Sequence, residues 1–254
     1  MANFAELLAL SAVMGLSVLL SLPIVLAKSV RSRTVVLLNA VAIGILVFLL
    51  ADVFSDAATI LYTNPASPYI VNGTYAAAFA ISVTACFLLL FAAEHRSPRR
   101  TLSPRGLALL VALAIGFQNL TEGLVFGAAW AAGAVALVAV IFVGFFLQNV
   151  TEGFPIAAPL VGKGERAIGV LFALFLVGGI PTILGSAIGY FYNGPLLDVT
   201  FDALAIGAIL YIILPMLRMA FRPAETPETS YLKQRLTYVG ILLGFVLGFL
   251  VNAV

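Results

Sequence analysis

The residues best suited to carry chemistry form a short repeat inside two apolar stretches of the chain. Residues 118–123 read Gln-Asn-Leu-Thr-Glu-Gly, and residues 148–153 read Gln-Asn-Val-Thr-Glu-Gly. Chance similarity between two apolar stretches would repeat Leu, Ala and Val, whereas these two share Gln, Asn, Thr and Glu. The repeat therefore indicates two polar surfaces that serve the same site.

Helical spacing places the polar residues of each copy on one face. Side chains three or four positions apart share a helix face. Gln118 follows Arg105 by 13 residues, and Gln148 precedes Lys163 by 15 residues. At about 1.5 Å per residue, both lie roughly 20 Å from the basic residues at the ends of the two stretches, which we expect at one surface of a membrane. Two antiparallel helices would thus bring six side chains together: Gln118, Asn119, Glu122, Gln148, Asn149 and Glu152.

The chemistry of these six side chains favours a cation. Two carboxylates in the lipid interior cannot both stay ionised without a cation or a proton. Oxygens of Glu, Gln and Asn are suitable ligands for a divalent metal. The six residues are therefore predicted to be metal ligands. Two alternatives remain: a polar seam that joins the helices by hydrogen bonds, and a proton relay without a metal. A seam accounts poorly for two facing glutamates.

A second acidic pair, Asp52 and Asp56, also has helical spacing. Asp52 follows Arg33 by 19 residues, so it lies about 28 Å above that surface of the membrane. We interpret the pair as an outer gate or vestibule that attracts cations. The alternative is interfacial charge solvated by the outer water layer. A third pair, Asp198 and Asp202, is expected at the outer start of its span.

The elements that position these residues are membrane spans. The chain has 254 residues, of which 63% are hydrophobic and 9% charged, and its mean hydropathy is +1.15. A soluble chain is about 25% charged, so a soluble domain and a disordered chain are both excluded. We predict an all-α membrane protein, a single transmembrane domain over residues 1–254, with the lipid bilayer as its partner. The net charge of +2 does not indicate a nucleic-acid partner.

Eight stretches are long and apolar enough to span a bilayer, which requires roughly 20 residues. The first is interpreted as a retained span rather than a signal peptide, because no cationic segment precedes it. The spans are expected at about 5–27, 35–62, 69–93, 105–129, 131–160, 167–191, 196–219 and 234–253.

The cationic residues orient these spans. All 13 Lys and Arg fall in alternate connections, at 28–33, 96–105, 163–166 and 218–235. Cytoplasmic loops collect Lys and Arg. The pattern therefore predicts a multi-pass protein of the cell membrane with both the N-terminus and the C-terminus outside.

Eight spans, outward termini and paired polar motifs resemble the ZIP family of divalent-metal transporters. In that family the fourth span carries a His-Asn-x-x-Asp/Glu-Gly pattern, matched here by residues 118–123. The fifth span carries His/Gln-Asn/Asp/Glu-x-x-Glu/His, often followed by Gly and Ala-Ala-Pro, matched by residues 148–153 and 157–159. The resemblance implies transport of a divalent metal toward the cytoplasm by a homodimer. It also implies that spans one, four, five and six move against the other four, like an elevator.

Two departures from the family pattern bear on the metal. Gln118 replaces the usual histidine, and Ile180 stands before Pro181 where the family often has Glu. Two glutamates balance only one divalent ion, so we predict a mononuclear site. An oxygen-only site suits Mn²⁺, Mg²⁺ or Fe²⁺ better than Zn²⁺.

The same departures leave a second hypothesis, a non-transporting relative that binds a metal or has a regulatory role. An enzyme is not expected. A catalytic zinc would usually need histidine ligands, and His95 is the only histidine of the chain.

Overall fold

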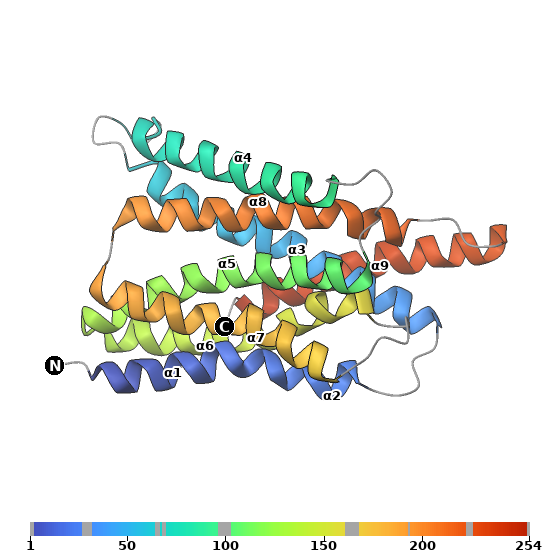
Figure 1. Cartoon of the computed structure of the whole chain (residues 1–254), viewed down its shortest axis with the longest axis horizontal. Coiled ribbons are helices and arrows are strands. Elements are labelled where there is room, and N and C mark those ends of the chain that lie inside the picture. The colour runs from blue at the N-terminus through green and yellow to red at the C-terminus, as the bar shows by residue number, and fades with distance from the viewer. Residues whose placement is uncertain are drawn as a thin grey trace.

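The computed structural model of the chain describes residues 3–26, 32–63, 67, 70–95, 103–160, 168–192, 194–221 and 226–252. Within those ranges every regular element is helical. Eight of the described helical segments are long and apolar enough to cross a membrane. The expected all-helical class and the presence of eight helices of membrane-spanning length are thereby confirmed, and Figure 1 shows the long helices running along one common axis.

The helices follow one another in the expected order. They are α1 (Phe4–Leu16), the 3₁₀ segment η1 (Ser17–Ser21), α2 (Leu22–Val25), α3 (Ser32–Leu61), α4 (Gly73–His95), α5 (Pro104–Ala131), α6 (Val135–Ala157), the 3₁₀ segment η2 (Ala158–Leu160), α7 (Ile168–Phe191), α8 (Pro195–Ala220) and α9 (Pro227–Asn252).

Two helices begin at positions that hydropathy does not predict. Helix α4 begins at Gly73 rather than near residue 69, because the Asn72 side chain accepts a hydrogen bond from the backbone N–H of Thr74 at 3.1 Å. Helix α9 begins about seven residues before the expected residue 234. Its first turns are polar, and the Thr226 hydroxyl accepts a hydrogen bond from the Thr229 N–H at 3.3 Å. Hydropathy locates the apolar part of a helix, whereas capping residues set where it starts.

The first span is not one continuous α-helix. It tightens into η1 between α1 and α2. The Ser17 hydroxyl donates to the carbonyl of Met14 at 2.7 Å and to the carbonyl of Phe146 in α6 at 2.8 Å. Ser21 lies against Gly153, where a Cβ atom would have no room. The 3₁₀ segment therefore fits the first span closely against the helix that carries the second motif.

Helices α1, α5, α6 and α7 form what we call the first helix group. The most extensive packing in the molecule is between α5 and α7. Glycines make it possible: a Cβ on Gly185 or Gly189 of α7 would run into the backbone of Leu120 or Leu124 of α5. Helix α1 packs on α6 and α7. The helices that carry the two motifs therefore share a group with α1 and α7.

Helices α3, α4, α8 and α9 form the second helix group. Gly44 of α3 and Gly244 of α9 lie at a close crossing of those two helices, and α4 packs along α8. The two groups meet chiefly where α5 contacts α8 and where α3 contacts α6. Figure 1 shows α4 and α8 on one side of the molecule and α1 on the other, with α5 between them.

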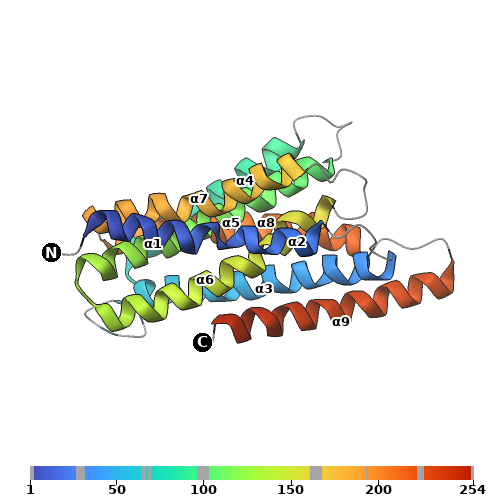
Figure 2. The same ribbon diagram turned by 90° about the horizontal axis from the view of Figure 1, so that it is seen from below.

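Helix α1 begins at one end of the bundle, and α9 runs toward that end but stops well short of it, as Figures 1 and 2 both show. The described cationic residues of the connections lie near the other ends of their helices: Arg33, Arg105, Arg218, Lys233 and Arg235. The remaining cations lie outside the described residues: Lys28, Arg31, Arg96, Arg99, Arg100, Lys163, Arg166 and Arg222. The side that faces the cytoplasm stays a prediction.

Candidate functional site

The structure brings all six motif residues together inside the first helix group. Gln118, Asn119 and Glu122 come from α5, and the other three come from α6. Each of the six is at most 7% exposed. The helical spacing of the motifs thus does place their polar side chains on facing surfaces, and their role as metal ligands stays a prediction.

The amide of Asn119 lies at the centre of this cluster. Its Nδ2 is within hydrogen-bond distance of Asn149 Oδ1 (2.7 Å), Glu152 Oε2 (2.9 Å) and the Gly178 carbonyl oxygen (3.0 Å). Gly178 belongs to α7. One side chain therefore links α5 to both α6 and α7.

Glu122 is held by a glutamine from each motif. Its Oε1 accepts hydrogen bonds from Gln118 Nε2 at 3.0 Å and from Gln148 Nε2 at 2.6 Å. The carboxylates of Glu122 and Glu152 thus each receive amide donors on one oxygen, because Asn119 serves Glu152 in the same way. Three hydrogen bonds between side chains join the two motifs and fix their relative positions.

The cluster has more acceptors than donors. Five of its buried oxygens have no hydrogen-bond partner among the described residues: Gln118 Oε1, Asn119 Oδ1, Glu122 Oε2, Gln148 Oε1 and Glu152 Oε1. A buried acceptor without a donor is costly, and such groups are rare in native proteins. What these oxygens share is an affinity for a positively charged partner. These five oxygens therefore fit a cation that prefers oxygen ligands.

The carboxylates alone do not form a metal site. Within the described part of the chain, no three His, Cys, Asp or Glu side chains are arranged to hold one metal ion. An ion between the motifs would therefore need amide oxygens beside the oxygens of Glu122 and Glu152. This requirement suits a hard cation better than zinc.

The prolines near the motifs do not interrupt their helices. Helix α6 continues through Pro155 and ends in a short 3₁₀ turn, and α7 continues through Pro181. The polar cluster is thus built on continuous helices.

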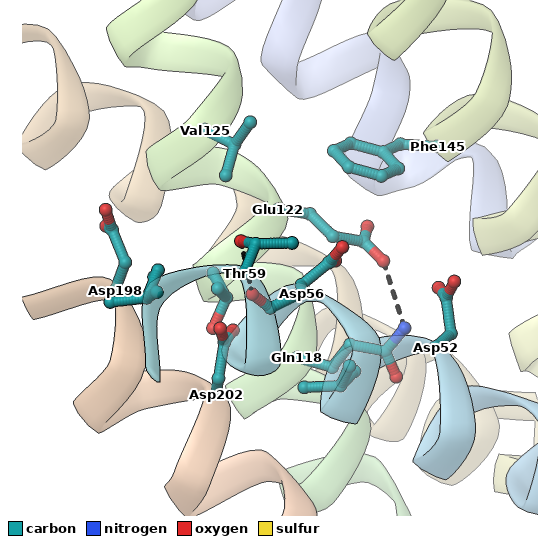
Figure 3. A pocket seen from close by; sticks show the side chains of 12 residues that line it. Asp52, Asp56, Thr59, Gln118, Glu122, Val125, Phe145, Asp198 and Asp202 are labelled. Atoms are coloured by element: carbon teal, nitrogen blue, oxygen red, sulfur yellow. Dashed lines mark hydrogen bonds between the residues drawn. The ribbon is translucent and has the colours of Figure 1, made fainter. Parts of the chain in front are cut away.

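A cavity of about 370 Å³ adjoins the cluster at the interface of the two helix groups. Gln118 and Glu122 form part of its wall, so it leads directly to the first motif. Asp52 and Asp56 of α3 line it as well, and Figure 3 shows both beside Glu122. The structure therefore places the predicted vestibule pair next to the motif residues, and its role in attracting cations stays a prediction.

Sequence analysis missed the contribution of α8 to this cavity. Asp198 and Asp202 also line it, although they were expected only at the outer start of their span. Asp202 is 2% exposed, and its Oδ1 has no hydrogen-bond partner among the described residues. The available signal was the four-residue spacing of this pair, which matches that of Asp52 and Asp56.

Comparison of the chain with protein-family models and with curated proteins gives no match in either case. The fold and the site together define a class: a helical bundle with eight helices able to cross a membrane and a polar, carboxylate-containing cluster inside it.

Proposed function

We propose that this protein is a ZIP-like transporter that moves a divalent metal cation toward the cytoplasm. The cation is its substrate and binds between α5 and α6. Glu122 and Glu152 are its anionic ligands, and Gln118, Asn119, Gln148 and Asn149 supply neutral oxygens. The observation that carries this proposal is the set of five buried acceptor oxygens without donors.

The imbalance of donors and acceptors favours a cation over a purely structural seam. A seam should pair its own amides and carboxylates, as Asn119 and Asn149 do. Here each glutamate keeps one buried oxygen without a partner. Two carboxylates balance the charge of one divalent ion, so binding of a single ion between the motifs is favoured. The oxygen ligands favour Mn²⁺, Mg²⁺ or Fe²⁺ over Zn²⁺.

The arrangement of the two helix groups supports transport rather than binding alone. The motif residues lie on the first helix group, and the cavity beside them is walled partly by α3 and α8 of the second. Sliding of one group against the other would carry the ion away from the cavity. This division matches the moving and fixed spans that the ZIP resemblance implies. By the same resemblance, the active form is a homodimer.

Uptake of Mn²⁺ into proteoliposomes tests this function. Glu122→Gln and Glu152→Gln should each abolish uptake, because each removes one of the two charges that hold the ion. Glu6→Gln is the matched control, because Glu6 is exposed near the start of α1 and does not line the cavity. This control should transport like the wild type.

Three outcomes would contradict the transporter. Unchanged uptake in both glutamate variants would show that the cluster does not carry the ion. Mn²⁺ binding by the wild type without uptake would support the non-transporting alternative. Absence of Mn²⁺ binding in calorimetry would exclude the metal site and would favour the polar seam or the proton relay as the role of the cluster.

A further inference from the structure

The cavity beside the motif cluster is lined by more carboxyl groups than one bound divalent ion would balance. Five carboxylates line it: Asp52, Asp56, Glu122, Asp198 and Asp202. None of the described residues that line it is Lys, Arg or His. Charges at membrane depth are expensive unless a partner compensates them. A divalent ion held between Glu122 and Glu152 would not balance Asp56, Asp198 and Asp202 on α3 and α8.

Asp202 is the most deeply buried of the described aspartates that line the cavity. It is 2% exposed, and its Oδ1 has no hydrogen-bond partner among the described residues. Thr121 of α5 lines the same cavity, and its hydroxyl donates to the Phe117 carbonyl at 3.3 Å. At least one oxygen of the Asp202 carboxyl group is therefore available to a ligand in the cavity.

The acidic side chains form a series across the cavity. Asp202 lies within electrostatic range of Asp56 and Asp198, whereas Glu122 lies within range of Asp52, Asp56 and Glu152. Asp56 therefore belongs to both neighbourhoods, and Figure 3 shows it between Glu122 and Asp202. A cation near Asp202 would have a continuous acidic route to the motif cluster.

The spacing of these groups favours an ion that keeps its water. In the described part of the chain no three acidic side chains converge closely enough to bind one metal directly. The cavity of about 370 Å³ is large enough to hold a cation together with several waters. Mg²⁺ and similar hard cations give up their water shell reluctantly. The geometry suits carboxylates that contact the cation through its water shell.

We propose that Asp202, together with Asp56 and Asp198, forms a second cation subsite on the α8 side of the cavity. It holds a hydrated divalent cation before that ion moves to Glu122 and Glu152. The proposal rests on the proposed function, which supplies the divalent cation as ligand. The full protein would then bind two ions of different character, one in the motif cluster and one in the cavity.

Mn²⁺ binding to the full chain in lipid nanodiscs tests the subsite. Calorimetry should find two Mn²⁺ ions in the wild type and one in Asp202→Asn. In proteoliposomes Asp202→Asn should raise the KM for Mn²⁺ about tenfold, since it removes one of three charges that attract the ion. Glu6→Gln should change neither quantity. Proton resonances of bound water on the second Mn²⁺ should be visible by electron–nuclear double resonance.

The variants separate failure of the subsite from failure of the proposed function. Two Mn²⁺ ions and an unchanged KM in Asp202→Asn would overturn the subsite, while loss of uptake in Glu122→Gln would still support the transporter. Unchanged uptake in both Glu122→Gln and Glu152→Gln would overturn the transporter, and the stoichiometry of Asp202→Asn would still decide the subsite. A second Mn²⁺ without bound water would overturn the proposed hydrated state.

A folding control completes the test. If Asp202→Asn does not fold, Asp198→Asn tests the same subsite from the partly exposed wall of the cavity. It should weaken binding of the second ion about threefold or more, as expected for loss of a partly exposed charge that water screens. Unchanged binding of the second ion in Asp198→Asn would then overturn the subsite.

Discussion

At the scale of residues, amide side chains determine how the two glutamates of the cluster are presented. Gln118 and Gln148 both donate to Glu122, and Asn119 donates to Glu152. Each carboxylate is thereby fixed by one oxygen and keeps the other without a partner. A cation between the motifs would meet carboxylates whose orientation is already set, which lowers the cost of ordering them on binding.

The identity of residue 118 should therefore set the preference among metals. Gln118→His adds an imidazole beside Glu122, and imidazole nitrogen suits zinc better than an amide oxygen does. We expect the ratio of Zn²⁺ to Mn²⁺ uptake to rise by about tenfold or more. A metal-panel uptake assay in proteoliposomes measures the ratio.

The matching control for this variant is Gln148→Asn, which keeps an amide in the cluster and adds no nitrogen ligand. It should leave the ratio of Zn²⁺ to Mn²⁺ uptake near that of the wild type. An equal ratio in Gln118→His and the wild type would show that residue 118 does not select the metal.

At the scale of elements, the sequence predicts the helices and the motif faces well. Apolar length gives eight spans, and the four-residue period puts Gln118 and Glu122 on one face. The sequence does not predict η1, since residues 17–21 contain neither Gly nor Pro. It also does not reveal the contact of Asn119 with Gly178 or the burial of Asp202. Both depend on which helices pack together, and a single helix's periodicity holds no information about that.

The crossing of α5 and α7 should tolerate no side chain at its closest point. A Cβ on Gly185 would meet the backbone of Leu120, which cannot move aside as a flexible side chain can. Gly185→Ala should therefore destabilise the protein by about 1–3 kcal/mol, the usual cost of overpacking. Thermal unfolding in detergent measures this loss as a lower Tm.

Gly144→Ala is the matched control on α6, because a Cβ there meets nothing within 4 Å. Alanine favours a helix over glycine, so this variant should be as stable as the wild type or slightly more so. Equal Tm values for Gly185→Ala and Gly144→Ala would refute the close backbone packing of α5 and α7.

At the scale of the whole molecule, the proposed function makes the cavity at the interface of the two helix groups the route by which an ion would reach the cluster. Val125 of α5 lines this cavity and is 42% exposed. Leu113 lies on the same helix, is 40% exposed and is not among the described lining residues. The two positions therefore distinguish exposure to the cavity from exposure elsewhere on the helix.

A cysteine at residue 125 should react with a membrane-impermeant thiol reagent added from outside. The background is Cys86→Ala, which removes the single native cysteine. Val125→Cys should be labelled, and Mn²⁺ should slow the labelling if the cation occupies the cavity. Leu113→Cys should stay unlabelled, since a thiol surrounded by lipid does not ionise. Labelling of Val125→Cys only from the cytoplasmic side would reverse the predicted orientation of the termini.

The two copies of the repeated motif are alike in sequence but not in surroundings. Glu122 lines the cavity, whereas Glu152 is fully buried and is not among the described residues that line it. A cation arriving through the cavity would therefore meet Glu122 first and Glu152 last. The two glutamates would then act in succession. Glu122 would capture the ion, and Glu152 would complete its coordination shell. Loss of Glu122 would prevent capture of the ion, and loss of Glu152 would let a captured ion escape.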